Sequence, residues 1–506
     1  MASFGAEPCE TSTNARARDK KKFKERTGDA VEAHKEAKFV QWLTDCGAKF
    51  SNCVELKSYG EEIRGVHAAR DLQSEEILIE VPLRCLITVE MGKATDVGRA
   101  VLEAELELDA PKHVFLMLFV LLDRRDTRSF FVPYYDMLPS TLSNMPIFWD
   151  AQELQWLQGS HILAQIEERK RAIKNDYDAI CKIWPSFIET CTLEDFKWAR
   201  MCVCSRNFGV VIDGVRTSAM VPYADMLNHF RPRETKWTYD NSRGAFTITS
   251  LQNISVGAQI YDSYGQKCNH RFLLNYGFAV EDNQEPDGFC PNEAALLLRL
   301  SPDDALASRK QLLWIRDGAV GAKRIRVCAS DNENFRACMS LLRVVAADEA
   351  ELDQILGHTP YGSYRTASDI HFPISLRNEC AALVLLKHTC QNALDQYPTN
   401  LSDDLKALTS DKLTPFSNQR HATIHVKSEK VVLHHYVHFA ATALDLAQMQ
   451  PNEFDVSLAN LIHSNNHHHV AAYSNGTLRQ VRRIERMHPD MRKLSPPIDL
   501  STPTIV

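Results

Sequence analysis

Two stretches of the sequence bring together polar side chains that could serve a chemical reaction. The first begins at Val221 and ends with Asp225, Asn228 and His229, and the second places Tyr264 directly before a glycine. Irregular polar segments attached to short strands are more typical of a binding or catalytic site than of a core. Each stretch is weak evidence alone, because an Asn-His pair after a strand is more often part of a turn.

The elements that would position these residues are short strands and turns. Residues 221–229 and 260–265 are each predicted to be a short apolar strand that ends in polar residues. Between them, residues 245–251 alternate as a half-buried strand does. Upstream, residues 102–125 and 149–184 have helical periodicity, so a helical block separates two strand-rich segments.

Four motifs follow one another along the chain in a specific order. They are Arg206-Asn-Phe, Asp225-Met-Leu-Asn-His229, Ile260-Tyr-Asp-Ser-Tyr-Gly265 and Cys268-Asn-His-Arg-Phe-Leu-Leu-Asn-Tyr-Gly-Phe278, and the block Glu62–Asp71 precedes them. In this order they resemble a SET-domain methyltransferase, in the branch that holds the Rubisco large-subunit lysine methyltransferase and the actin histidine methyltransferase. The resemblance covers residues 40–485 and is strongest at 205–283.

The resemblance implies an α+β chain with a split SET fold of short β-sheets, a helical insert and an all-α C-terminal substrate-binding domain. The expected segments are a disordered basic arm at 1–34, a SET domain at 35–283 with its insert near 100–200, a helical substrate-binding domain at 290–485 and a loose tail at 486–506. Helical stripes of apolar residues at 335–345, 383–394 and 431–446 are predicted to face the core of the third segment.

The resemblance also implies the reaction, which is transfer of a methyl group from S-adenosylmethionine to a protein side chain without a metal. Its catalytic tyrosine matches Tyr264, and the tyrosine that contacts the target amine matches Tyr276. The cofactor-binding positions match Glu62, Arg64, Arg206, Asn228, His229 and Phe278. The chain departs from the family at Ile63, where a glycine is usual, and keeps Gly65.

Each of these residues also has a purely structural interpretation. Arg206 could be a surface ion-pair partner, Tyr264 a turn residue and His229 a satisfied core histidine, whereas the joint order of the motifs favours the catalytic interpretation. Asp225 could either cap the loop that presents Asn228 or contact the substrate. A non-catalytic SET scaffold that recruits a partner protein is the alternative from another functional class.

Two residues favour lysine over histidine as the methylated side chain. The actin histidine methyltransferase has an asparagine two residues after the cofactor-side arginine and a tryptophan before the aspartate of the Asp-x-x-Asn-His loop, and lysine-directed relatives have an aromatic residue at the first position. This chain has Phe208 and Ala224 there. Phe208 offers an apolar face for an aliphatic stem and an amine, and it has no hydrogen-bonding group for an imidazole. Histidine methylation remains the alternative.

Composition limits the partners and the compartment. The net charge of −7 gives no general attraction to nucleic acid or to an anionic membrane. The 14 cysteines lack a paired framework and no secretory apolar segment accompanies them, so we expect free thiols in a reducing compartment. The expected protein is a cytoplasmic monomer, with the nucleus as a second location because of the basic arm, and it acts on a lysine-bearing protein substrate.

Overall fold

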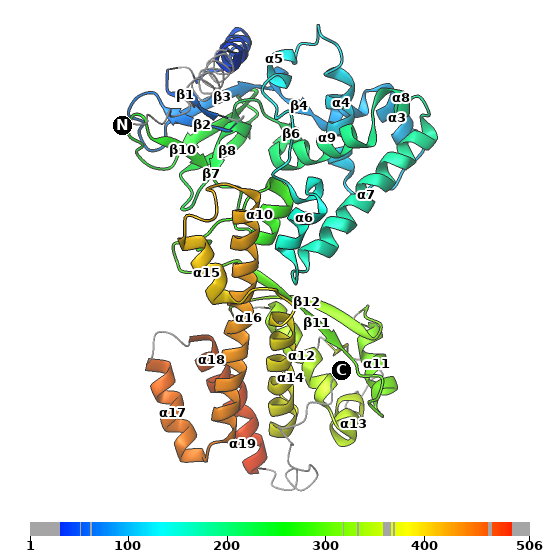
Figure 1. Ribbon diagram of the computed structural model, residues 1–506, viewed down its shortest axis with the longest axis vertical. Coiled ribbons are helices and arrows are strands. Elements are labelled where there is room, and N and C mark those ends of the chain that lie inside the picture. Colours follow the sequence, from blue (N-terminus) through cyan, green and yellow to red (C-terminus); the bar gives the residue numbers. More distant parts are fainter. Residues whose placement is uncertain are drawn as a thin grey trace, which may run out of the picture. The chain divides into compact units, whose positions relative to one another are not determined.

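The computed structural model describes residues 31–50, 52–60, 63–316, 318–330, 333–357, 366–367, 370–463 and 468–487. They form two compact units (Figure 1). Unit 1 combines the described residues up to Ser143 with Glu168–Gln266, and unit 2 combines Asn144–Glu167 with the described residues from Lys267 onward. Glu62, residues 1–30 of the expected basic arm and residues 488–506 of the expected tail lie outside the described residues.

Unit 1 is built on short β-sheets, which confirms the predicted SET-type architecture. Within the described residues its strands pair in the orders β1-β2-β10-β7, β3-β9-β8 and β4-β6-β5. Their bounds are β1 (Val54–Gly60), β2 (Ile63–Ala68), β3 (Ile77–Pro82), β4 (Ile87–Thr88), β5 (Asn207–Ile212), β6 (Val215–Met220), β7 (Asn228–His229), β8 (Thr235–Asp240), β9 (Ala245–Ser250) and β10 (Gln259–Asp262). β9 and β10 confirm the strands predicted near residues 245–251 and 260–265.

The strand predicted over residues 221–229 is wrong for most of its length. β6 ends at Met220, and Pro222 has no N–H group with which to continue a β-ladder. The chain then turns at Tyr223, which has φ of 72°, and Ala224–Met226 form the 3-10 helix η4 before β7 begins. The apolar pattern of this stretch therefore reflects a buried turn.

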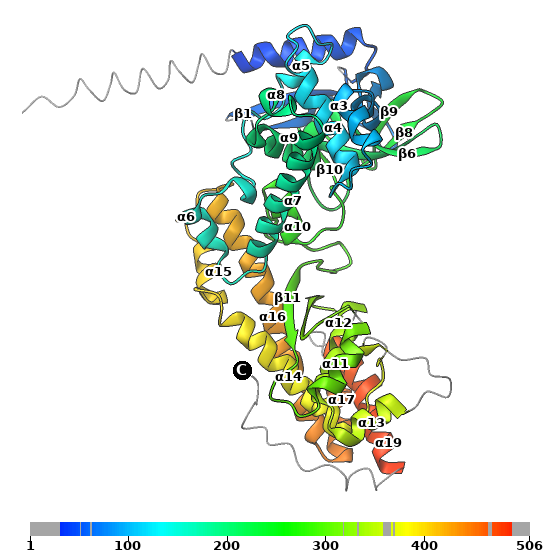
Figure 2. The ribbon, with the colours of Figure 1, turned by 90° about the vertical axis from the view of Figure 1, so that its right-hand side faces the viewer.

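Helices pack around these sheets. The first covers residues 31–45, so it begins inside the segment that we expected to be disordered, and it lies beside α5 (Figure 2). The others are η1 (Leu83–Cys85), α2 (Val89–Lys93), α3 (Asp96–Glu103), α4 (Pro111–Asp123), α5 (Val132–Tyr135), α7 (Ile162–Ile183), α8 (Phe187–Thr190) and α9 (Leu193–Arg206), and α7 begins in unit 2. The single helix predicted over 102–125 is wrong, because α3 ends at Glu103 and Pro111 starts a new helix at its first turn.

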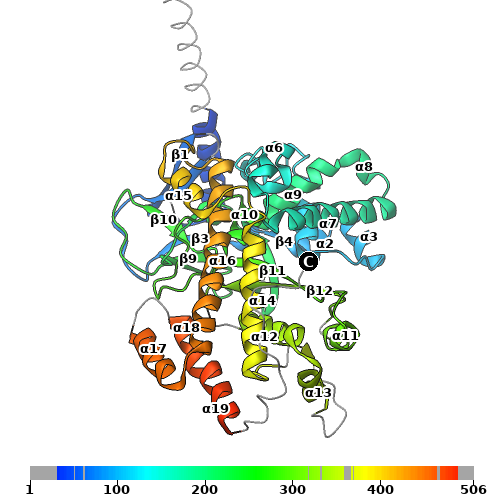
Figure 3. The same ribbon diagram turned by 60° about the horizontal axis from the view of Figure 1, so that its bottom comes forward.

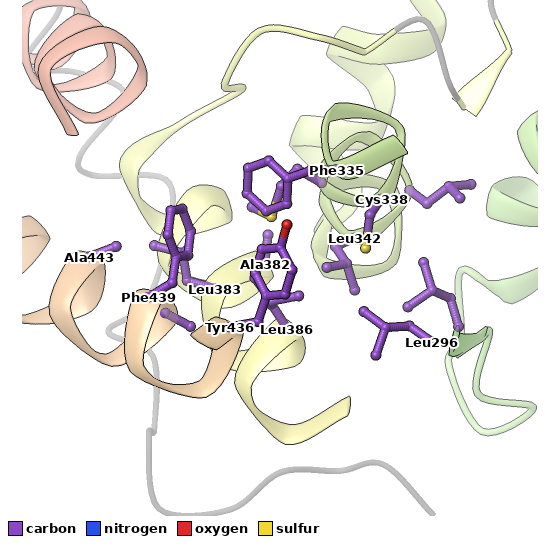
Figure 4. Close-up of a cluster of buried hydrophobic side chains, with 14 of the residues drawn as sticks. Leu296, Phe335, Cys338, Leu342, Ala382, Leu383, Leu386, Tyr436, Phe439 and Ala443 are labelled. Carbon is purple, nitrogen blue, oxygen red and sulfur yellow. The ribbon is translucent and has the colours of Figure 1, made fainter. Parts of the chain in front are cut away.

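Unit 2 is mainly helical, and α14 and α16 lie side by side at its centre with α17, α18 and α19 beside them (Figure 3). Its helical elements are η2 (Pro146–Phe148), α6 (Ala151–Leu154), η3 (Gln155–Leu157), α10 (Asn269–Tyr276), α11 (Ala307–Arg316), α12 (Glu333–Ala346), α13 (Glu349–Gly357), α14 (Leu376–Leu394), α15 (Leu401–Thr409), α16 (Asn418–Gln448), α17 (Pro451–His463), α18 (His468–Tyr473), the π-helical turn η6 (Ser474–Leu478) and α19 (Arg479–Met487). Figure 4 shows Phe335, Leu383 and Phe439 meeting in the core between α12, α14 and α16, which confirms the three predicted stripes.

The prediction that this domain is all-α is wrong. β11 (Glu293–Arg299) and β12 (Ala322–Cys328) form an antiparallel pair in unit 2. Alternate residues of β11, beginning with Ala294, are buried in the core. The burial alternates, but the sequence does not, because Ala295 and Leu297 on the other face are apolar as well, and alanine and leucine favour helices. No helix among the described residues is long and apolar enough to cross a membrane.

Candidate active site

Strand pairing brings the Asn-His motif and Tyr264 together. β7 runs parallel to β10, with Asn228 opposite Tyr261, and Tyr264 follows two residues after β10 ends. The Tyr264 N–H donates to Nδ1 of His229 at 3.1 Å, and the two rings lie 5.3 Å apart. Since Nδ1 accepts this hydrogen bond, a neutral His229 carries its proton on Nε2.

The hydroxyl of Tyr264 is held in one place by a backbone group. It donates to the carbonyl oxygen of Leu227 at 2.8 Å, at the end of the turn that contains η4. The phenol proton is therefore engaged, and the position of the phenol oxygen is fixed. A fixed polar atom of this kind can orient a reacting group without reorganisation during the reaction.

Asn228 joins three strands through its side-chain amide. Its Nδ2 donates to the backbone oxygen of Arg64 on β2 at 3.0 Å and to Oε1 of Gln259 on β10 at 2.7 Å. Two of the predicted cofactor positions, Asn228 and Arg64, are thus adjacent. Gly65 leaves room for this arrangement, because a Cβ there would lie 2.6 Å from Oε1 of Gln259.

Arg206 and Asp225 form a buried ion pair beneath this strand junction. Nη1 of Arg206 donates to the backbone oxygen and to Oδ2 of Asp225, both at 3.1 Å, and the Tyr134 hydroxyl donates to the same Oδ2 at 2.9 Å. The Asp225 side chain is fully buried, whereas Arg206 keeps 23% exposure. Burial raises the pKa of Asp225, and Arg206 and Tyr134 oppose that shift. This is the geometry expected if Asp225 fixes the loop that presents Asn228.

The Arg64 side chain points to the N-terminal helix. Its Nη2 lies 3.1 Å from Oε1 of Glu32, and its Nη1 donates to the backbone oxygen of Met137 at 3.1 Å. Burial lowers the pKa of the Arg64 guanidinium, and the Glu32 carboxylate opposes this effect. The expected cofactor contact at this position thus rests on the backbone of Arg64, as the resemblance implies, while its side chain serves the fold.

Buried polar atoms remain at this junction for a ligand. Nε of Arg206 and Oδ1 of Asp225 are inaccessible to solvent and have no hydrogen-bond partner within the described protein. Buried polar groups in native proteins nearly always have partners. The amino-acid part of S-adenosylmethionine carries a carboxylate, which suits the guanidinium of Arg206, whose side chain keeps 23% exposure. The residues present therefore fit this cofactor.

The two positions predicted to choose the substrate side chain carry apolar side chains. The Phe208 ring lies 5.0 Å from the ring of Phe246 and 5.3 Å from that of Trp237, in edge-on contacts. Ala224 is buried in η4. Neither side chain can hydrogen-bond, so any selection that they make rests on shape and polarity.

Tyr276 and Phe278 belong to unit 2, where they frame the end of α10. Gly277 between them has φ of 77° and closes the helix, and a Cβ there would lie 2.2 Å from Nδ2 of Asn144. The ring of Phe278 stacks on Phe272 of α10 at 5.1 Å. Tyr276 and Phe278 therefore lie in unit 2, whereas the other described site residues lie in unit 1.

The sequence did not point to Tyr134 or Gln259. Tyr134 lies 91 residues from Asp225 in the sequence. The residues next to it in the sequence indicate only a short helix and no functional site. Gln259 opens a strand that was predicted to begin one residue later. No group of three or more His, Cys, Asp or Glu side chains in the described part of the chain is placed to hold a metal ion.

Comparison with protein families gives two matches. Residues 63–265 match the SET domain, and residues 301–433 match the Rubisco LSMT substrate-binding domain. Among curated proteins, the actin-histidine N-methyltransferase of Gallus gallus is 26% identical over 418 residues, which cover 80% of this chain and 68% of that protein. The Mus musculus protein is 26% identical over 386 residues, which cover 74% of this chain and 63% of its own length.

Solved structures share the fold at lower identity. The SET domain of LSMT bound to lysine and AdoHcy superposes with a TM-score of 0.68 at 22% identity, covering 86% of this chain and 97% of that one. Rubisco LSMT bound to AdoMet gives a TM-score of 0.66 at 22% identity, with coverage of 85% and 97%. Both resemblances extend over the two units together.

Proposed function

The chain carries a SET domain followed by a Rubisco LSMT substrate-binding domain and is an S-adenosylmethionine-dependent protein methyltransferase of that fold; we propose that the group it methylates is a lysine side chain of a protein. The actin-histidine enzymes among its relatives make histidine the competing substrate. The observation that carries the choice is the apolar character of Phe208 and Ala224.

The protein residues at the junction of β2, β7 and β10 bind, orient and shield the reactants. Bound S-adenosylmethionine supplies an electrophilic methyl group on its sulfonium. The backbone around Arg64, the Asn228–His229 pair and Arg206 hold its adenine and amino-acid parts. Tyr264, with its proton fixed on Leu227, presents a phenol oxygen that aligns the methyl group with the incoming amine.

The incoming lysine must be neutral to attack. From an ordinary pKa near 10.4, deprotonation at pH 7 costs roughly 4.6 kcal/mol. An apolar lining reduces this cost because it disfavours the ammonium form. The Phe208 ring, packed edge-on against Trp237 and Phe246, would contribute to such a lining, and the Phe208 side chain itself offers an imidazole no hydrogen-bond partner.

The choice between lysine and histidine is tested by identifying the product. The purified protein is incubated with labelled S-adenosylmethionine and a lysate, and the modified residue is mapped by mass spectrometry. We expect methyl-lysine in the wild type, and we expect the Phe208→Asn, Ala224→Trp double variant to lose lysine methylation. Methyl-histidine as the main wild-type product would contradict the lysine proposal.

Tyr264→Phe tests the methyl transfer itself. The substitution removes the hydroxyl that Leu227 holds, and we expect turnover to fall by roughly 10²-fold with little change in cofactor affinity. Turnover is measured by release of S-adenosylhomocysteine and affinity by calorimetry. Unchanged turnover would move the catalytic role away from Tyr264, whereas cofactor binding without turnover in the wild type would favour a scaffold protein.

Unit 2 is proposed to bind the protein substrate. Substitution of exposed charged residues of unit 2 should raise KM for the protein substrate. KM for S-adenosylmethionine should stay unchanged, because these residues lie outside the junction of β2, β7 and β10 in unit 1. Lys406→Glu on α15 and Arg483→Glu on α19 belong to the set, and exposed Arg171→Glu on α7 is the control in unit 1. If every variant in the set keeps the wild-type KM, unit 2 only supports the fold.

A further inference from the structure

The position of the Tyr264 hydroxyl depends on the backbone turn between β6 and β7. Its acceptor, the Leu227 carbonyl, follows directly after η4. Inside the turn, the N–H of Asp225 donates to Val221 at 3.1 Å, and that of Leu227 donates to Ala224 at 3.3 Å. A shift of this turn would therefore move the group that fixes Tyr264.

The turn is not held by local preference alone. Tyr223 adopts φ of 72° and ψ of −45°, a conformation that a residue with a bulky side chain rarely occupies and that persists only when its surroundings enforce it. Its ring is packed against Phe50 at 4.3 Å and stacked on Phe39 at 6.2 Å. The turn thus needs contacts from distant parts of the chain.

The second distant contact reaches the turn through Asp225. Arg206 binds both its backbone oxygen and its Oδ2, and the Tyr134 hydroxyl donates to that same Oδ2. Tyr134 is fully buried, and its ring stacks against Phe39 at 6.2 Å. α5 therefore connects to the turn through the Tyr134 phenol, whose ring also packs on the N-terminal helix.

We propose that Tyr134 is a positioning residue for methyl transfer, whose hydroxyl fixes Asp225 and, through the turn, places the Leu227 carbonyl that holds Tyr264. The proposal rests on the proposed function of Tyr264. Tyr134 itself does not touch the reacting groups in this role. It sets the orientation of a group that does.

The neighbouring residue provides a matched control. Tyr135 follows Tyr134 on α5, and its hydroxyl donates to Oδ2 of Asp123 on α4 at 2.7 Å. Tyr135→Phe removes the same kind of bond, from a phenol to a carboxylate, but Asp123 ends α4 and accepts from Ser129 and Tyr135, which lie outside the turn. Tyr134→Phe keeps the ring that packs on Phe39, so the variant is expected to fold.

The positioning is measured without turnover, by carbon NMR of the full-length protein labelled at Cζ of tyrosine. The Tyr264 signal is identified by its loss in Tyr264→Phe. We expect Tyr134→Phe to shift it, Tyr135→Phe to leave it in place, and Asp225→Asn, which alters the same link from the other end, to shift it too. An unchanged signal in Tyr134→Phe, or equal shifts in Tyr134→Phe and Tyr135→Phe, would overturn the proposal.

Kinetics then test whether Tyr134 acts through Tyr264. Tyr134→Phe should lower kcat about tenfold, while KM for S-adenosylmethionine changes by less than about twofold. The double variant with Tyr264→Phe should be no slower than Tyr264→Phe alone, since the link then has nothing to position. Losses that multiply would refute the link. Absence of turnover in the wild type would instead refute the proposed function and leave the NMR result to decide the positioning.

Discussion

Asp225→Asn should destabilise the protein because it removes the charge that compensates Arg206. The Asp225 side chain is fully buried, and Arg206 retains 23% exposure. Loss of one partner from a buried ion pair costs about 3–5 kcal/mol. Since Arg206 keeps some contact with water and Tyr134 can still donate to the asparagine oxygen, we expect the lower end, about 3 kcal/mol. In a unit of this size that corresponds to a fall in Tm of about 6–12 °C.

The assay is urea unfolding of the purified protein followed by circular dichroism and tryptophan fluorescence. The control is Asp178→Asn, which breaks the exposed Lys174–Asp178 pair on α7, where both side chains are more than half exposed. Exposed pairs of this kind contribute about 0.3–0.5 kcal/mol. The two substitutions make the same chemical change, so their difference isolates the effect of burial.

The reasoning fails if Asp225→Asn lowers the unfolding free energy no more than Asp178→Asn does. A second variant tests the cause of the loss. Arg206→Met combined with Asp225→Asn removes the uncompensated guanidinium, so it should recover part of the stability that Asp225→Asn alone loses. No recovery would mean that the cost comes from altered packing.

Three further outcomes are expected. Asn228→Ala removes two hydrogen bonds and should weaken S-adenosylmethionine binding about tenfold, by calorimetry, while the circular dichroism spectrum is retained; equal affinity would refute the site assignment. Gly65→Ala should displace Gln259 and weaken the same binding about fivefold, and wild-type affinity would show that the strands adapt. His421 accepts from the Ala279 N–H, and burial lowers its pKa, so the stability that it contributes is present above pH 6.5 and is lost as pH falls below that value; an unchanged pH dependence of unfolding in His421→Gln would contradict this.

Patterns in the local sequence predicted the elements whose apolar residues recur at a regular spacing. The helical stripes on α12, α14 and α16 each bury one regular face, so their periodicity was readable. β9 was predicted from its alternating apolar residues, although it is buried at nearly every position. The order of motifs also predicted that Asn228, His229 and Tyr264 would meet. Their adjacency follows from parallel pairing of β7 with β10, which the sequence does not specify on its own.

Contacts between distant residues account for what was missed. The turn at Tyr223 depends on rings from Phe39 and Phe50, which are far away in the chain. Arg206 was expected to serve the cofactor, and its pairing with Asp225, which also accepts a hydrogen bond from Tyr134, became visible only in three dimensions. β11 was missed because helix-favouring alanine and leucine occupy its core-facing positions, and β12 has no partner in the pairing without it.

Phe39 on the N-terminal helix has a practical consequence for how this protein is produced. The SET domain match begins at residue 63, which suggests a convenient starting point for a shorter recombinant protein. Such a fragment would lack Phe39 and Phe50, and it would expose the rings of Tyr134 and Tyr223 that these residues cover. Newly exposed aromatic surface promotes aggregation. Expression trials that respect the domain match but omit residues 31–50 should therefore yield insoluble or inactive material, even though every predicted site residue except Glu62 is present.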